Sequence, residues 1–362
     1  MWKYKLLVNL SVLFSQPTGI SNYATNLIQY LKPLNPTLLT VHNYSDFDCY
    51  QIPANLSPAQ GIKGHFRRLF WTQFKLATIY QKCQSTLLFS PLPEAPLYNN
   101  GCSYVVMVHD FIPLRFPQDS LPQTLYYRHY VPQVLQQSQQ IICNSTATAT
   151  DIVKFTKVPA HKVTPIPLGY DRVHFRPLNL PVNNSCPYFL YIGRHNPHKN
   201  VSGLIAAFAK INNYSDYELW LVGSQDQRYT PQLKLQVKEL NLQNKVKFLD
   251  YISYQELPAI INNALALVFP SLWEGFGLPV LEAMACGTPV ITSNISSLPE
   301  VTGDAAILIN PYKTAEITAA MEAVIKDEQM RSQLSILSLE RAKQFSWAKT
   351  GRDTVEVLQK YI

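Results

Sequence analysis

The residues of this chain best suited to chemistry lie in two loops of its C-terminal half. Arg194 and Lys199 stand in a polar loop that follows an apolar run. A guanidinium offers a fork of donors to a phosphate group, and an ammonium offers a compact charge. Glu274 and Glu282 flank a second loop, and carboxylates accept hydrogen bonds from sugar or ribose hydroxyls. These four side chains predict a ligand rich in phosphate and hydroxyl groups, such as a nucleotide sugar.

The second loop joins a predicted strand to a predicted helix. The apolar run 264–269 is typical of a buried parallel strand, and Pro279 suits the first turn of a helix because its φ is fixed and no N–H is needed there. A strand–loop–helix junction presents unpaired backbone N–H groups to an anion. Glu274 and Glu282 are a little over two helical turns apart, so both can face the same cleft. The residues after Glu274 are Gly275, Phe276, Gly277 and Leu278.

Three positions of the N-terminal half also lie at the ends of predicted strands. His109 follows the buried strand 104–108, where open α/β sheets bind ligands, although it could simply cap that strand. Gly19 lies between a first strand and a first helix, where it either makes the turn or lets a ligand approach the backbone. Ser145 stands at a predicted helix N-cap.

Composition favours a two-domain enzyme with an anionic partner. The chain has 362 residues, of which 47% are hydrophobic and 15% charged, so there is ample material for two cores. The formal net charge of +7 suits an anionic ligand or an acidic membrane surface, but it does not by itself indicate nucleic acid, and we expect none as a partner.

The cysteines and the N-terminus predict a cytoplasmic protein. None of the six cysteines forms a CxxC pair, and no histidine cluster has metal-ligand spacing, so we expect reduced thiols and no metal. Lys3 and Lys5 precede an apolar run that is too short for a signal sequence, and no apolar stretch is long enough to span a membrane.

Strand and helix patterns alternate along the whole chain. This alternation predicts an α/β protein with two doubly wound, Rossmann-like domains facing a cleft. The best linker candidate, 176–187, contains three prolines and three asparagines. We therefore expect an N-terminal domain over 1–175, a C-terminal domain over 188–344 that binds the nucleotide sugar, and a final helix over 345–362 that packs on the first domain.

The segment 63–76 interleaves basic residues with large aromatics. Its residues Phe66, Leu69, Phe70, Phe74 and Ala77 fall at helical spacing. Two interpretations are open. The aromatic stripe of this helix faces its own core, or it contacts an anionic membrane on the cytoplasmic face.

The two loops of the C-terminal half resemble those of the retaining glycosyltransferases of family 4, which have the GT-B architecture. The resemblance rests on Gly193-Arg194 with Lys199-Asn200 and on the E-x7-E pair Glu274 and Glu282. His109-Asp110, Thr18-Gly19, Asn144-Ser145 and the segment Phe345-Ser346-Trp347 with the final helix are also similar. Many members carry two adjacent glycines where this chain has Thr18-Gly19.

The resemblance implies a role for each matching residue. Arg194 and Lys199 would neutralise the diphosphate leaving group, with amides of the 275–277 loop holding the phosphates and the sugar. Glu274 would bind hydroxyls of the donor sugar, and Glu282 those of the ribose. His109 would contact the transferred sugar near its C6 hydroxyl. Donor-side contacts are also implied for Gly19, Ser145, Gly193 and Leu278.

The implied reaction is retaining hexosyl transfer by front-face attack, without a metal or another cofactor. The donor would be GDP-mannose or, next, UDP-glucose, because His109-Asp110-Phe111-Ile112-Pro113-Leu114 and the tyrosine-rich helix after it look like bacterial mannosyltransferases. The acceptor would be a glycan or a lipid-linked saccharide of polysaccharide biosynthesis. Two alternatives are a non-hydrolysing nucleotide-sugar epimerase, against which the E-x7-E pair counts, and a non-catalytic nucleotide-sugar-binding subunit.

Overall fold

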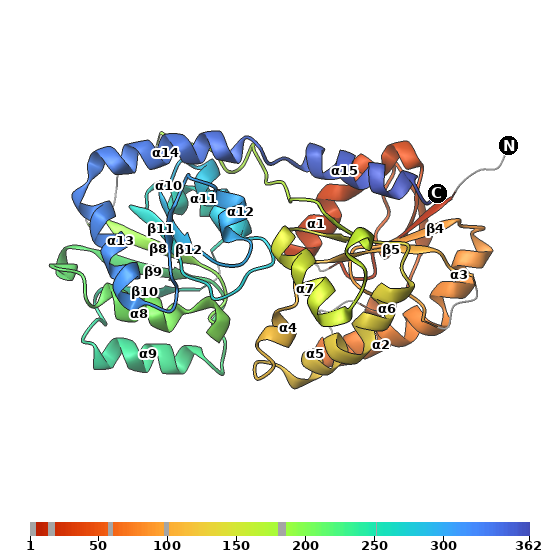
Figure 1. Cartoon of the computed structure of the whole chain (residues 1–362), viewed down its shortest axis with the longest axis horizontal. Helices are drawn as coiled ribbons and strands as arrows, with labels where there is room; N and C mark the ends of the chain where they lie inside the picture. The colour runs from red at the N-terminus through yellow and green to blue at the C-terminus, as the bar shows by residue number, and fades with distance from the viewer. Residues whose placement is uncertain (1–4, 14–18, 57–60, 98–100, 180–185, 251) are drawn as a thin grey trace. The chain divides into compact units, whose positions relative to one another are not determined.

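The chain folds into two compact units, seen in a computed structural model that describes residues 5–13, 19–56, 61–97, 101–179, 186–250 and 252–362. Unit 1 comprises Met1–Gly169 together with Trp347–Ile362, and unit 2 comprises Tyr170–Ser346. Each unit is a parallel sheet with helices on both faces (Figure 1). The proposed linker 176–187 lies partly outside the described residues.

Unit 1 contains a seven-stranded sheet of order β3-β2-β1-β4-β5-β6-β7, in which every neighbouring pair is parallel. The strands are almost entirely buried except at the edges, as expected for a sheet covered by helices. Their bounds are β1 (Leu6–Asn9), β2 (Thr37–Thr40), β3 (Asp48–Gln51), β4 (Leu87–Ser90), β5 (Tyr104–Val108), β6 (Gln140–Cys143) and β7 (Val163–Pro165).

Helices α1 and α15 lie with η1 on one face of this sheet, and α2 to α7 lie on the opposite face (Figure 1). The helices are α1 (Gly19–Ile28), η1 (Gln29–Leu34), α2 (Gly61–Phe74), α3 (Leu76–Lys82), α4 (Ile112–Arg115), α5 (Leu121–Leu125), η4 (Tyr126–Tyr130), α6 (Val131–Gln137), α7 (Thr146–Thr156) and α15 (Trp347–Gln359). The final helix α15 packs on α1 and η1, so the end of the chain completes the first unit.

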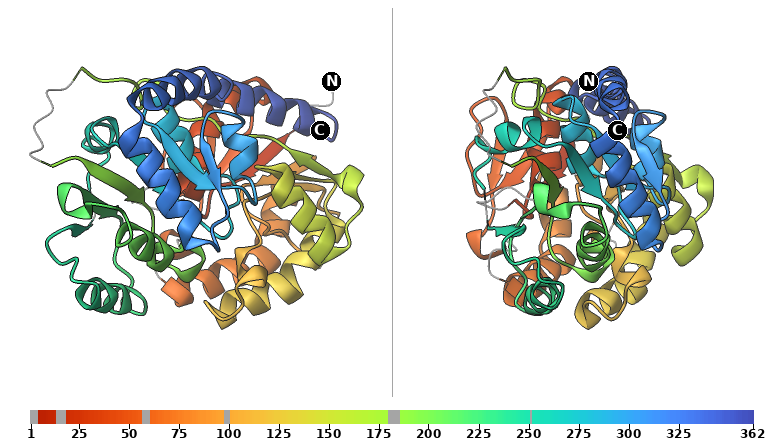
Figure 2. Two further views of the ribbon diagram at one scale, coloured as in Figure 1. Left: turned by 60° about the vertical axis from the view of Figure 1, so that its left-hand side comes forward. Right: turned by 90° about the vertical axis from the view of Figure 1, so that its left-hand side faces the viewer.

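Unit 2 contains a six-stranded parallel sheet of order β10-β9-β8-β11-β12-β13. Its strands are β8 (Tyr188–Ile192), β9 (Glu218–Val222), β10 (Val246–Leu249), β11 (Ala266–Phe269), β12 (Val290–Ser293) and β13 (Ile307–Ile309). Helices α8 (Val201–Phe208), α9 (Thr230–Glu239) and α13 (Thr314–Lys326) cover one face (Figure 2). The other face carries α10 (Leu257–Asn262), α11 (Leu278–Ala285), α12 (Leu298–Thr302) and α14 (Glu328–Ala342).

Residues just after Gly169 belong to unit 2 because their side chains bind there. Arg172 donates hydrogen bonds from Nη2 to the carbonyls of Lys343 and Phe345, at 2.7 and 2.9 Å. The His174 ring stacks on Tyr254 with 3.8 Å between centroids. The first unit therefore ends before residue 175.

In both sheets the strand order reverses once. The reversal lies between two neighbouring strands, β1 and β4 in unit 1 and β8 and β11 in unit 2. In a doubly wound sheet the connections leaving two such strands run to opposite faces, and the space between their carboxyl ends receives ligands. The fold thus confirms the predicted pair of Rossmann-like domains, and the reversal point of each sheet is where domains of this kind commonly bind ligands.

Helix α2 contradicts the interpretation in which its aromatic stripe faces the core. Its aromatic stripe does not face the core: Phe66, Phe70 and Phe74 are 63%, 64% and 57% exposed. The inward face carries Arg68 and Trp71 instead. Periodicity located the stripe but did not reveal which side of the helix packs on the sheet. In the part of the chain that the structure describes, no helix is both long and apolar enough to cross a membrane.

Candidate active site

The two loops singled out in the sequence follow neighbouring strands at the reversal point of unit 2. Strand β8 leads into the loop with Arg194 and Lys199, and β11 leads into the glycine loop. The two strands pair directly, with Ala266 opposite Phe189. The carbonyl of His198 accepts a hydrogen bond of 2.7 Å from the amide of Leu272, which holds the loops together. Sheet topology thus brings both sets of residues to one edge.

Lys199 and Glu274 form an ion pair at this edge. The Lys199 Nζ lies 2.6 Å from Oε1 and 2.8 Å from Oε2 of Glu274. The lysine side chain is 18% exposed and the glutamate 9%, so the pair is largely shielded from water. Nζ also lies 5.7 Å from the centre of the Phe269 ring. An ammonium has three donors, so a further acceptor can bind the same nitrogen.

Arg194 supplies a second cation on the first loop. It is exposed, and within the described residues its guanidinium makes no hydrogen bond. Its charge reaches Asp226, whose pKa is held below the ordinary value first by the hydrogen bond from Arg228 and further by Arg194. The Arg194 carbonyl accepts a hydrogen bond of 2.9 Å from the buried Tyr191 hydroxyl, which fixes the loop at Gly193. Arg194 is therefore positioned by its backbone while its charge stays available.

The glycine loop is shaped so that two of its amides, those of Phe276 and Gly277, stay open. Gly277 has φ of +112°, and a Cβ there would lie 2.8 Å from Leu298 Cδ2, so only glycine fits without strain. The Ser297 hydroxyl is the shared donor to the carbonyls of Glu274 and Phe276, at 3.1 and 2.8 Å. Within the described chain the amides of Phe276 and Gly277 have no hydrogen-bond partner. They sit at the start of α11 and can receive an anion. No motif in the sequence marks Ser297 as part of this loop.

Glu282 projects from α11 in a different environment. Burial raises the pKa of this carboxyl to about 8, and the side chain makes no hydrogen bond among the described residues. The proton it retains gives it one donor besides its acceptor oxygens. Such a group can exchange hydrogen bonds with a pair of hydroxyls.

Unit 1 brings His109, Ser145 and helix α1 together around the end of β5. Nε2 of His109 lies 3.0 Å from the Pro91 carbonyl, which can only accept, so this nitrogen carries the proton of the neutral ring. Burial lowers the pKa of His109 to about 4, against a smaller opposing effect of that hydrogen bond. The ring meets Tyr23 of α1 edge-on, with 5.2 Å between centroids. Its Nδ1 is therefore an acceptor at neutral pH.

In this unit Ser145 caps one helix and Gly19 begins another. The Ser145 Oγ accepts a hydrogen bond of 3.0 Å from the Thr148 amide, so it is the N-cap of α7. The Thr148 hydroxyl in turn donates to the carbonyl of His109 at 3.5 Å. Gly19 is the first residue of α1, and a Cβ there would meet nothing within 4 Å. Its neighbour Thr18 lies outside the described residues.

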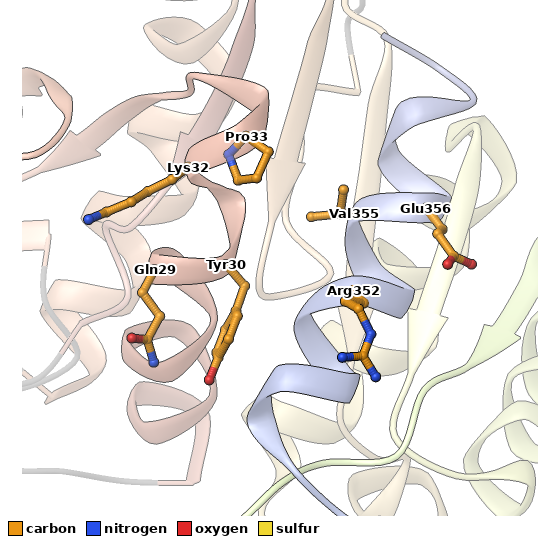
Figure 3. A pocket seen from close by; sticks show the side chains of 7 residues that line it. All are labelled: Gln29, Tyr30, Lys32, Pro33, Arg352, Val355 and Glu356. Carbon is orange, nitrogen blue, oxygen red and sulfur yellow. The ribbon is translucent and has the colours of Figure 1, made fainter.

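Two cavities are not lined by these residues, although the second borders the loop that carries Arg194 and Lys199. One of about 440 Å³ separates η1 from α15 in unit 1 and has a mixed lining (Figure 3). The lining residues are Gln29, Tyr30, Lys32, Pro33, Arg352, Val355 and Glu356. A second, of about 230 Å³, lies beside α8 and α9, where His195 Nε2 has no partner among the described residues. Across all residues that the structure describes, no group of three His, Cys, Asp or Glu side chains could bind a metal ion.

Comparison with known families agrees with this arrangement. Residues 178–338 match the family described as Glycosyl transferases group 1, and residues 17–173 match Glycosyltransferase Family 4. The two matches are consecutive and together span most of the chain. The chain belongs to glycosyltransferase family 4. The two regions matched correspond to the two halves of the GT-B fold.

Two of its relatives in the family are bacterial. The O-antigen chain mannosyltransferase B of Escherichia coli is 30% identical over 64% of this chain, and the match spans 63% of that protein. The O-antigen chain mannosyltransferase RfbU of Salmonella typhimurium is 29% identical over 84% of this chain and 87% of its own length. The solved structure of Anabaena HepE in complex with UDP-glucose has the same fold, with a TM-score of 0.77 at 18% identity over 98% of this chain and 99% of that one.

Proposed function

We propose that this chain transfers a hexose from a nucleotide-diphosphate sugar to a glycan or lipid-linked acceptor, with retention of anomeric configuration. The observation that carries the proposal is the Lys199–Glu274 pair beside Arg194 and the open amides of the glycine loop. Cations and open amides can bind a diphosphate, and carboxyls can bind hydroxyls. This combination fits a nucleotide sugar better than a free phosphate or a free sugar.

In the proposed reaction the protein mainly stabilises the leaving group. The bond between the anomeric carbon and the diphosphate oxygen breaks, and a new bond forms to the acceptor oxygen on the same face. The acceptor proton passes to an oxygen of the departing phosphate. Lys199 and Arg194 hold the growing negative charge, which is the term that lowers the barrier. Glu274 orients the sugar hydroxyls, and correct positioning supplies the rest.

His109 contributes as a neutral hydrogen-bond acceptor in this scheme. Its Nε2 proton is directed at Pro91, so Nδ1 can accept a hydrogen bond from a sugar hydroxyl near C6. A neutral ring places no positive charge beside the electron-poor anomeric carbon. The low pKa of His109 supports this role.

We expect transfer without a metal ion. Two side-chain cations and a helix N-terminus can neutralise a diphosphate in place of Mg²⁺. Addition of EDTA should therefore leave the rate of transfer unchanged. Loss of activity on chelation, with recovery on adding Mg²⁺ or Mn²⁺, would contradict this part of the proposal.

GDP-mannose is the preferred donor and UDP-glucose the second. Two relatives carry mannosyltransferase names, and a structural neighbour was solved with UDP-glucose. The same relatives are O-antigen chain enzymes, which favours an acceptor in bacterial surface polysaccharide. An epimerase on the same architecture remains the alternative, and it would convert the donor without an acceptor.

The decisive experiment is a panel of nucleotide sugars tested by thermal shift and then by product analysis. The true donor should raise Tm in a concentration-dependent way because it binds the folded state alone. Incubation with an acceptor should then give a glycoside of retained configuration, read by proton NMR. Conversion of the sugar without transfer would indicate an epimerase, and binding without any product would indicate a non-catalytic subunit.

A further inference from the structure

Helix α2 presents an outward face that combines aromatic rings with positive charge. The face consists of Lys63, Phe66, Arg67, Phe70 and Phe74 of the helix together with Lys75, the residue that follows it, and all six are exposed. The three rings recur every fourth residue, so they line one side of the helix over about 12 Å. Phe70 and Phe74 touch, with 4.6 Å between ring centroids. Exposed phenylalanines in a continuous row indicate a surface that binds something.

The inner side of α2 is held firmly, so this outward face cannot rotate into the core. Arg68 makes a two-pronged ion pair with Glu94, at 2.7 Å from Nε and 2.8 Å from Nη2. Both side chains are under 5% exposed. Gln73 donates a hydrogen bond of 2.8 Å to the Tyr130 hydroxyl, and Trp71 is buried beside it. Breaking such a buried pair is costly, which fixes the orientation of the helix.

Charge on this part of the chain has one sign. Between Asp48 and Glu94 the sequence contains five lysines and arginines but no acidic residue. Glu94 itself is buried and satisfied by Arg68, so it does not offset the exposed cations. The surface of α2 is therefore positive and apolar at once, which complements an anionic lipid surface.

We propose that the α2 face seats this protein on the surface of an anionic lipid bilayer. The phenylalanines enter the boundary between headgroups and acyl chains, and the three cations contact lipid phosphates. A second copy of the chain is a poorer occupant, because a symmetric pairing of this face would bring the cations of both copies together. Membrane seating does not depend on the proposed sugar transfer, since it concerns unit 1 alone and needs no donor.

The test is cosedimentation of the full chain with vesicles, without nucleotide sugar. Vesicles of phosphatidylcholine alone are compared with vesicles that also contain phosphatidylglycerol, at low and high salt. We expect binding to the anionic vesicles and its loss at high salt. Replacing Lys63, Arg67 and Lys75 by Gln should weaken binding about a hundredfold, and replacing Phe66, Phe70 and Phe74 by Ser about tenfold or more.

Matched controls come from exposed residues of unit 2. The variants Leu235→Ser and Ile336→Ser remove apolar side chains that are 55% and 63% exposed. Lys234→Gln with Lys238→Gln removes two exposed cations of α9. All of these controls should bind vesicles like the unchanged protein, and all variants should keep its Tm.

A depth measurement guards against misfolded variants. The single substitution Phe70→Trp keeps an aromatic ring, and its added fluorescence should shift to the blue on anionic vesicles and be quenched by brominated lipid. The proposal is overturned if the unchanged protein does not bind anionic vesicles, or if the serine variant binds as well as the controls. It is equally overturned if the serine substitutions alter only the oligomeric state.

Discussion

Lys199 and Glu274, which come from different loops of unit 2, meet through both carboxylate oxygens at 2.6 and 2.8 Å. The loops meet because β8 and β11 are neighbours at the reversal point of the sheet. When no ligand is bound, the Glu274 carboxylate compensates the positive charge of the shielded Lys199, and Lys199 fixes the orientation of that carboxylate. A bound diphosphate would share the ammonium, so binding and local stability are coupled at this point.

The first prediction concerns Lys199. Lys199→Ala should lower the turnover of sugar transfer about a hundredfold to a thousandfold, because a shielded charge on a leaving group is worth several kcal/mol. It should also destabilise the protein, since Glu274 loses its partner in a largely buried site. Steady-state kinetics and urea unfolding give the two values. Near-normal transfer by this variant would refute the proposed role.

A double variant separates chemistry from stability. In Lys199→Met with Glu274→Gln no unpaired buried charge remains, so stability should largely recover while turnover stays low. The matched control is Lys247→Ala, which breaks the 2.7 Å pair with Glu218 elsewhere in unit 2. Its turnover should not change.

The second prediction follows from the raised pKa of Glu282, about 8 in the folded protein. Burial favours the protonated carboxylic acid. Below the pKa of the unfolded chain, folding therefore buries no charge at this residue. As pH rises through 8 the free energy of unfolding falls, because the folded protein retains a proton that the unfolded chain releases. Glu282→Gln has no such dependence. Its stability relative to the unchanged protein should therefore increase between pH 5 and pH 8, by up to about 1.4 kcal/mol per pH unit.

Urea unfolding at several pH values measures this difference. Glu340→Gln serves as the control because that side chain is 64% exposed, and its effect should be small and constant. A Glu282→Gln effect that does not vary with pH would mean that the carboxyl is ionised in the folded protein. Affinity for the donor should fall in this variant mainly above pH 8, where an ionised carboxylate offers the ribose a second acceptor oxygen that Gln lacks.

The third prediction concerns the protonation of His109. Its pKa is lowered to about 4, so the ring stays neutral at physiological pH, and the stability it contributes is present above pH 6.5 and lost as pH falls through 4. In proton NMR, the imidazole signal that disappears in His109→Gln should not titrate near pH 6.5. His129→Gln, which removes an exposed histidine, is the control for assigning the signal. Titration of His109 near 6.5 would rule out the neutral acceptor role.

Much of the fold was predictable because burial marks the strands. The central strands of both sheets are buried and mostly apolar, and their alternation with helices indicated two doubly wound domains. Strand β3 was missed because Asp48-Cys49-Tyr50-Gln51 lies at the sheet edge, is only partly buried and has no apolar run. The tyrosine-rich helix was predicted over 125–137, but its π-helical segment Tyr126–Tyr130 has no simple sequence signal.

The residues of the candidate site were predictable from the sequence, but the contacts that they make with one another were not. Arg194, Lys199 and the two glutamates were found from charge and spacing in loops after strands. Their pairing was not, because Lys199 could bind either a ligand or a carboxylate, and only the sheet order brings it to Glu274. Likewise, the helical period of α2 could not show that Arg68 would pair inside and leave the phenylalanines outside.

The last prediction compares two glycines, Gly19 and Gly277, each of which lies between a predicted strand and a predicted helix. Gly277 has φ of +112° and a Cβ there would lie 2.8 Å from Leu298, whereas Gly19 has open space around it. Gly277→Ala should therefore cost about 1–3 kcal/mol of unfolding free energy and weaken donor binding, since the amides at the start of α11 must shift. Gly19→Ala should change stability by no more than about 0.5 kcal/mol. Urea unfolding and thermal shift with the donor test both variants, and equal costs would show that the glycine loop is not strained as described.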